Sequence, residues 1–229
     1  MNMKNENKQE ISNGIGIAAE KALEFLEKII GGPIIEGTGI LTDKIQYIRF
    51  KNKVDRTIKA IEFLKSKGVT MPKKIPIKDL STLLEYSSYE DNETMQDCWS
   101  NLLANTLDPE NIFDTCYIFS QVLNQLSISE VVILNYMFIN SFQKSSEDRP
   151  YFEKKELVRK SESRLEMGVL IIDNLLRLRL IEEEPPRLIE RVRENSDNFD
   201  NKIITTELVL ADCYRLSSFG VQLMKQIIN

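Results

Sequence analysis

The sequence predicts a mainly α fold, in which an N-terminal helical bundle is followed by a winged helix-turn-helix-like C-terminal domain. Three observations lead to this prediction. Apolar residues recur at helical spacing through most of the 229-residue chain. Cap and breaker residues divide those stretches into helices of ordinary length. Two C-terminal segments, LRLRLIEEEP and IITTELVLADCYRLS, instead have the alternating, β-branched character of strands.

The first predicted helix covers residues 16–30, GIAAEKALEFLEKII. Its apolar residues fall on one face, and most of its charged residues fall on the other. Two glycines follow as a C-cap, and Pro33 prevents continuation of the helix. We therefore predict that residues 1–41 form an amphipathic, Gly-rich N-terminal segment.

Residues 42–127 are predicted to form a helical domain. Thr42 is placed to cap a long helix that ends near Lys67, before Gly68. Trp99, with the leucines that follow it, is predicted to anchor the core of this domain. Three further helices are predicted, over residues 78–87, 90–107 and 112–125.

Residues 128–229 are predicted to form the winged-helix-like domain. The helical pattern restarts at Ser127 and Glu130, which have the spacing of a capping box. The loop RENSDNFDN between the two strand-like segments fits an exposed wing. Helices are predicted over residues 129–142, 152–160, 163–178 and 217–228.

The helix that would enter a DNA major groove argues against DNA binding. Its sequence, SRLEMGVLIIDNLLRLR, is mostly apolar, and its polar positions include Glu166 and Asp173. Residues 144–229 carry 15 basic and 16 acidic side chains, without the positive surplus that supports nonspecific DNA affinity. We interpret this helix as a packing element and favour protein docking over nucleic acid for the domain.

Charge is distributed unevenly along the first two thirds of the chain. Residues 41–78 hold 11 basic and 3 acidic side chains, whereas residues 79–143 hold 10 acidic and no basic ones. Either the two segments neutralise one another within one domain, or they lie on separate faces and join copies head to tail. The predicted basic surface for self-association or contact with lipid headgroups consists of Lys44, Arg49, Lys51, Lys53, Arg56 and Lys59.

The composition predicts no enzyme, no cofactor and no metal site. Histidine is absent, which removes the usual general base and the usual nitrogen ligand. Cys98, Cys116 and Cys213 are far apart and are expected to be buried thiols. The polar N-terminus lacks the apolar core of a signal peptide, and no stretch has the 18 or so apolar residues of a membrane span. These features predict a cytoplasmic protein.

Four segments are informative together: the Gly/Pro segment with LTDKIQYIRFKNKV, then LLANTLDPEN, VLNQLSISEVVIL and LSSFGVQL. In their order and spacing they resemble the Abi-alpha family of bacterial abortive-infection proteins. The chain lacks the His-Pro pair that tends to precede the third segment in the family, and Ser217 and Ser218 stand in the fourth, where the family has a threonine. The resemblance implies antiphage defence, in which an infected cell stops growing or dies before virus release, and it implies no known reaction.

The stretch IIGGPIIEGTGIL suggests how such a protein could act on a membrane. Residues 15–41 form a stretch of about 27 residues of mostly small and apolar character, long enough to cross a bilayer if released and re-formed as a longer helix or hairpin. Glu36 opposes insertion of one copy, but a ring of copies can line a water-filled hole with its polar faces. In the resting state we expect a helix packed on the bundle. The candidate membrane-active residues are Ile15, Ile17, Leu23, Phe25, Leu26, Ile29, Ile30, Gly31, Gly32, Pro33, Ile34, Ile35, Gly37 and Gly39.

The leading interpretation is an effector that is triggered by a phage protein, forms a homo-oligomer, moves to the inner membrane and disrupts it. The alternative is a winged-helix nucleic-acid-binding regulator or toxin-system module. Gel shifts with strong salt dependence would favour the alternative. An enzyme of unrecognised type is a third reading, which a carboxylate substitution that abolishes protection without changing assembly would support.

Overall fold

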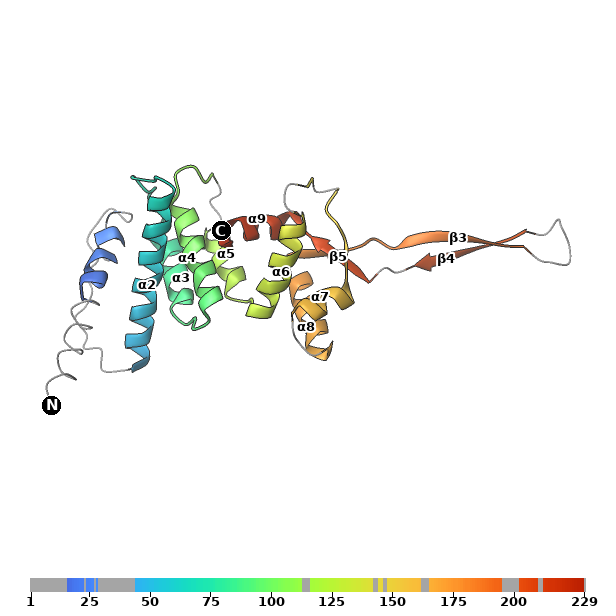
Figure 1. Cartoon of the computed structure of the whole chain (residues 1–229), viewed down its shortest axis with the longest axis horizontal. Helices are drawn as coiled ribbons and strands as arrows, with labels where there is room; N and C mark the ends of the chain where they lie inside the picture. The colour runs from blue at the N-terminus through green and yellow to red at the C-terminus, as the bar shows by residue number, and fades with distance from the viewer. Residues whose placement is uncertain are drawn as a thin grey trace. The chain divides into compact units, whose positions relative to one another are not determined.

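The computed structural model describes residues 16–22, 24–26, 28, 44–112, 116–141, 144–145, 148–161, 165–194, 202–209 and 212–228. Within helices and strands, the side chains of residues 44–47, 165, 187–194 and 202–209 are outside this description. The chain forms two compact units: unit 1 contains Met1–Ile128 and Lys225–Asn229, and unit 2 contains Ser129–Met224. Most of the elements are helices (Figure 1), so the mainly α class is confirmed.

Unit 1 begins with a helix at residues 16–22, 24–26 and 28, called here the N-terminal helix, followed by α2 (Lys44–Ser66). The end of α2 follows the prediction closely. Gly68 has a φ of +77°, in the left-handed region that favours glycine. The Val69 amide then donates to the Leu64 carbonyl at 2.9 Å, which satisfies one of the last carbonyls of the helix.

Three further helices complete the bundle of unit 1: α3 (Ile77–Ser87), α4 (Glu93–Leu107) and α5 (Cys116–Leu123). The predicted start of α4 at residue 90 was too early because Asn92 caps the helix. Its Oδ1 accepts a hydrogen bond from the Met95 amide at 3.1 Å. Helix α4 packs along α2 and is buried for most of its length. Trp99 is buried in this core, as predicted.

Unit 2 contains α6 (Ile128–Ser141) from Ser129 onward, β1 (Phe152–Glu153), α7 (Lys154–Lys160), α8 (Leu165–Arg177), β2 (Ile181–Glu183), β5 (Cys213–Leu216) and the start of α9 (Ser218–Ile227). The three short strands form an antiparallel sheet in the order β1-β5-β2. Ile172, Leu175, Leu180 and Leu216 are fully buried in this unit.

Two more strands, β3 (Arg187–Glu194) and β4 (Lys202–Val209), form a separate hairpin with Arg187 opposite Val209 and Glu194 opposite Lys202. The sequence prediction was wrong here in two respects. LRLRLIEEEP is mostly not a strand, because α8 continues to Arg177 and a turn with Arg179 at φ 56° follows. Strand β3 was not predicted, because its last two residues were read as part of the RENSDNFDN loop and the others were not assigned to an element.

Candidate functional site

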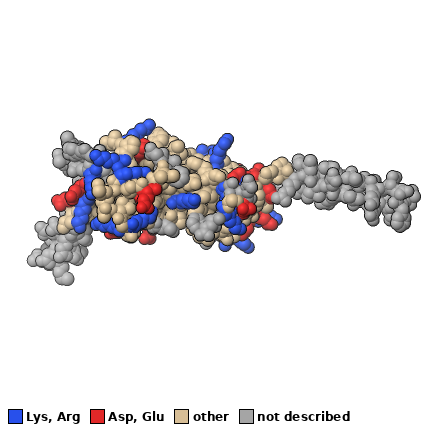
Figure 2. Space-filling model, turned by 90° about the horizontal axis from the view of Figure 1, so that it is seen from above, with Lys and Arg blue, Asp and Glu red and all other residues tan. Residues whose placement is uncertain are grey.

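Basic and acidic side chains are interspersed over the face of the molecule shown in Figure 2. Contacts within unit 1 explain part of this mixture. Arg49 forms an ion pair with Glu85, and its guanidinium lies 4.4 Å from the centre of the Tyr89 ring. Lys53 Nζ also approaches Glu85, at 3.3 Å, and Lys59 Nζ lies 2.5 Å from the Asp97 carboxylate. Each of these pairs joins the basic segment to the acidic one.

Glu85 is the centre of this cluster. Burial would by itself raise the pKa of its carboxyl group. The hydrogen bond that it accepts from the Tyr89 hydroxyl, at 3.0 Å, and the charges of Lys53 and Arg49 outweigh that effect. The pKa of Glu85 is therefore lowered, and the carboxylate form is favoured.

The remaining residues of the predicted basic surface differ from one another. Arg56 is only 1% exposed, and its Nε and Nη1 atoms have no hydrogen-bond partner within the described structure. Burial lowers the pKa of its guanidinium, against the attraction of Asp55, Asp97 and Glu90. Lys51 is exposed, and the side chain of Lys44 lies outside the described residues. The six cations therefore do not form one continuous exposed surface.

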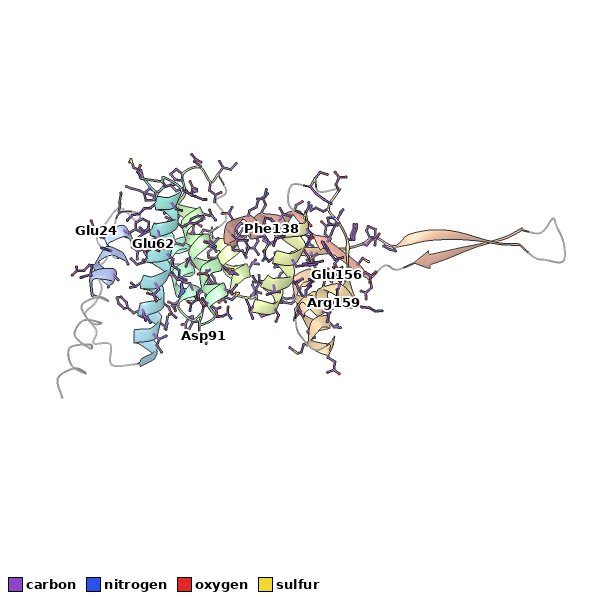
Figure 3. All side chains as sticks on the ribbon, viewed as in Figure 1. Glu24, Glu62, Asp91, Phe138, Glu156 and Arg159 are labelled. Carbon is purple, nitrogen blue, oxygen red and sulfur yellow. The ribbon has the colours of Figure 1, made fainter. Side chains whose placement is uncertain are left out.

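A groove of 590 Å³ lies between the N-terminal helix and α2. Figure 3 labels Glu24 on the N-terminal helix and Glu62 on α2, one from each wall. Apolar side chains from both helices contribute to the lining, and charged side chains from both form part of it. The lining residues are Ile17, Ala18, Lys21, Glu24, Phe25, Lys28, Ile58, Ile61, Glu62 and Lys65.

The described part of the predicted membrane-active segment is an amphipathic helix. Leu26 is 8% exposed and its neighbour one turn earlier, Ala22, is 2% exposed, whereas Ile17 is 56% exposed. Phe25 is half-buried at the groove. No helix among the described residues is long and apolar enough to cross a membrane. The other predicted residues lie outside the described ones: Ile15, Leu23, Ile29, Ile30, Gly31, Gly32, Pro33, Ile34, Ile35, Gly37 and Gly39.

Two of the segments that carry the family resemblance are connected with α9. LLANTLDPEN forms a hydrogen bond to α9, and LSSFGVQL contains its first residues. In the first, Asn105 Nδ2 donates to the Gln226 carbonyl at 2.9 Å, and Asn101, which directly precedes the segment, donates through Nδ2 to the Ile227 carbonyl at 3.1 Å. These bonds satisfy carbonyls of the last helical turn. The second segment forms the start of α9, where Ser217 Oγ accepts a hydrogen bond from the Gly220 amide at 2.9 Å.

The start of α9 is also fixed within unit 2. Arg149 donates to the Leu216 carbonyl at 2.6 Å and to Ser218 Oγ at 2.9 Å. A Cβ atom at Gly220 would lie 2.1 Å from the Leu180 carbonyl oxygen, so this position requires a glycine. The two sequence segments therefore have a structural role that the sequence did not reveal, because the contacts join residues far apart in the chain.

The outer face of α8 is apolar at its centre. Met167 and Leu170 are exposed, and the exposed carboxylates Glu166 and Asp173 lie on the same helix. The inner face holds Asn174, which donates a hydrogen bond to the buried carboxylate of Glu130 on α6. The prediction that α8 is mainly a packing element is therefore correct only for its inner face.

The thiols were predicted to be buried, and this holds for two of the three. Cys98 and Cys116 are buried, whereas Cys213 is half-buried. Burial raises the pKa of Cys98 to about 12, so it is a thiol at neutral pH. Among the residues described in the structure, no group of three or more acidic or cysteine side chains is arranged to hold a metal ion.

Comparison with known proteins gave one match. The family model described as abortive infection alpha matches residues 42–227. No curated protein and no solved structure matches the chain.

Proposed function

Because the chain belongs to the abortive infection alpha family, we propose that it is an antiphage effector that senses a phage component, self-associates and disrupts the inner membrane through its N-terminal segment. The family match supports abortive-infection defence, in which the infected cell is sacrificed or arrested. The proposal requires no catalysed reaction. It assigns the damaging step to the membrane and the sensing step to unit 2.

The groove under the N-terminal helix is the observation that carries this proposal. The groove of 590 Å³ leaves part of the boundary between this helix and α2 open to solvent. The two buried apolar side chains of the helix are Ala22 and Leu26 among the residues for which burial is described. Their burial stabilises the docked helix by roughly 2–4 kcal/mol, which binding of a trigger can offset. The rest of unit 1 keeps its own core around Trp99 and α4.

A released N-terminal helix would expose Leu26 and the half-buried Phe25, and would present them with the already exposed Ile17 to a lipid surface. Its charged face makes insertion of a single copy unfavourable. Several copies can place those faces around a water-filled hole, so self-association and membrane damage belong to the same step. Release from the resting position is therefore the event that the trigger must cause.

Unit 2 is the proposed sensor. The order α6-β1-α7-α8-β2-hairpin-β5, with sheet order β1-β5-β2, supports a winged-helix-like arrangement. In that arrangement α8 is the helix presented to a partner. Exposed Met167 and Leu170 beside Glu166 and Asp173 suit a protein surface better than a DNA groove, which attracts cations. A phage protein is the proposed partner.

The proposal is tested by expressing the chain without residues 1–41 and measuring both phage protection and propidium uptake by infected cells. We expect both to be lost, while circular dichroism and the unfolding transition show that the remaining chain is folded. Full protection by the shortened chain would refute the membrane mechanism. Salt-sensitive gel shifts without any propidium uptake would instead favour the nucleic-acid-binding regulator.

A further inference from the structure

Two loops at the C-terminal end of α2 expose apolar side chains to an unusual degree. Met71, in the loop between α2 and α3, is 76% exposed, and Ile112, which follows α4, is 86% exposed. These are the two most exposed large hydrophobic side chains in the part of the chain for which burial is described. Ile77, at the start of α3, is also exposed.

Hydrogen bonds from Lys73 hold the two loops side by side. Its backbone amide donates to the Leu107 carbonyl at 2.9 Å, and its Nζ donates to the Asn111 carbonyl at 2.8 Å. Asn111 directly precedes Ile112, so these bonds fix the exposed isoleucine near the α2–α3 loop. We call residues 65–78 together with residues 107–112 the basic apolar tip.

The tip is also positively charged. Residues 65–78 contain five lysines and no acidic residue, and residues 107–112 contain two carboxylates. Of these carboxylates, Asp108 is buried beside Lys67 at 3.5 Å, and Glu110 is exposed. Lys65 and Lys74 are exposed and form no ion pair with any described residue. Figure 2 views the molecule from the side on which α2 ends, a face that carries both basic and acidic side chains.

We propose that the basic apolar tip docks unit 1 on an anionic lipid surface. Lysines near such a surface are attracted to its headgroups, and each contributes about a fivefold increase in affinity. Met71 and Ile112 enter the boundary between headgroups and acyl chains, as apolar anchors of peripheral proteins do. A nucleic acid would attract the lysines through its phosphates but would not bury the two apolar side chains, so the combination favours lipid.

This proposal places the lipid contact away from residues 44–59 of α2. There, Arg49, Lys53 and Lys59 are already paired with carboxylates of unit 1, and Arg56 is buried. The proposal rests on the proposed function for its biological purpose. Docking itself needs neither a phage trigger nor release of the N-terminal helix, so it can be measured separately.

The test is co-sedimentation of the purified full-length chain with vesicles of phosphatidylcholine, with or without about one-third phosphatidylglycerol. We expect binding to the anionic vesicles, weakened by added salt, and little binding to the neutral ones. Lys65→Gln with Lys74→Gln should weaken binding about 25-fold, and Met71→Asp about tenfold. Lys155→Gln and Ile139→Asp are matched controls, because both remove an exposed side chain of the same kind outside the tip.

Equal binding by the natural chain and the tip variants would overturn the proposal, and so would an absence of binding to anionic vesicles. Binding to a DNA duplex that depends on Lys65 and Lys74, without binding to vesicles, would assign the tip to nucleic acid. Vesicles that bind the protein but keep an enclosed dye support docking alone. Loss of propidium uptake on deletion of residues 1–41 reports separately on the proposed function.

Discussion

The N-terminal helix and the end of α9 both belong to unit 1, but their packing differs. The N-terminal helix borders a groove of 590 Å³, and the exposed Ile17 is on that groove. Ile227 of α9 is fully buried, and Asn101 and Asn105 donate hydrogen bonds to carbonyls of its last turn. This difference indicates that the end of α9 is part of the core of unit 1. The proposed function requires that the N-terminal helix, in contrast, can leave without unfolding that core.

The largest expected effect is a loss of global stability, and its size should differ between variants of the two helices. Ile227→Ala should lower the free energy of unfolding by about 2–5 kcal/mol, because it leaves a cavity in the core. Leu26→Ala should lower it by less than about 1 kcal/mol, because detachment of the N-terminal helix precedes global unfolding. Urea unfolding followed by far-ultraviolet circular dichroism measures both. Similar losses for the two variants would mean that both helices are integral to the core.

The second prediction concerns a substitution that should disrupt only the docking of the N-terminal helix. Ala22 is buried, so Ala22→Trp should displace the helix and make the chain toxic without phage. Glu20→Trp adds the same side chain at an exposed position of the same helix and should leave growth normal until infection. Growth and propidium uptake of uninfected cells are the measurements. Normal growth and no propidium uptake with Ala22→Trp, in a protein shown to be folded, would contradict the release mechanism.

The third prediction concerns the polar contacts that hold α9. Asn105→Ala should lower the free energy of unfolding by about 1–3 kcal/mol, because the Gln226 carbonyl loses its donor in a buried setting. Asn140→Ala is the control, since Asn140 is exposed and bonds only to Tyr136 of its own helix among the contacts described. Chemical denaturation of both variants gives the comparison. An equal loss of unfolding free energy in the two variants would show that burial of the Asn105 hydrogen bond adds nothing to stability.

Local signals in the sequence were sufficient for most helices but not for the contacts between them. Gly68 and Asn92 end and begin helices through bonds to near neighbours, and such bonds leave a readable pattern. Glu85 and Arg49 are 36 residues apart, so their pairing depends on tertiary structure. The exposure of Met71 and Ile112 could not be predicted for the same reason. It depends on how the tertiary structure packs around the ends of α2 and α4.

The smallest expected effect comes from Glu85, whose lowered pKa links stability to pH. Its ordinary pKa is 4.5, and the folded chain lowers it, so the carboxylate contributes stability above that pH and loses it as pH falls through the lower, folded value. Because the side chain is 44% exposed, solvent screening limits the contribution to below about 1 kcal/mol. Glu85→Gln should reduce the loss of stability between pH 7 and roughly pH 3. An identical pH dependence in the natural chain and in Glu85→Gln would show that the Glu85 cluster is not coupled to folding.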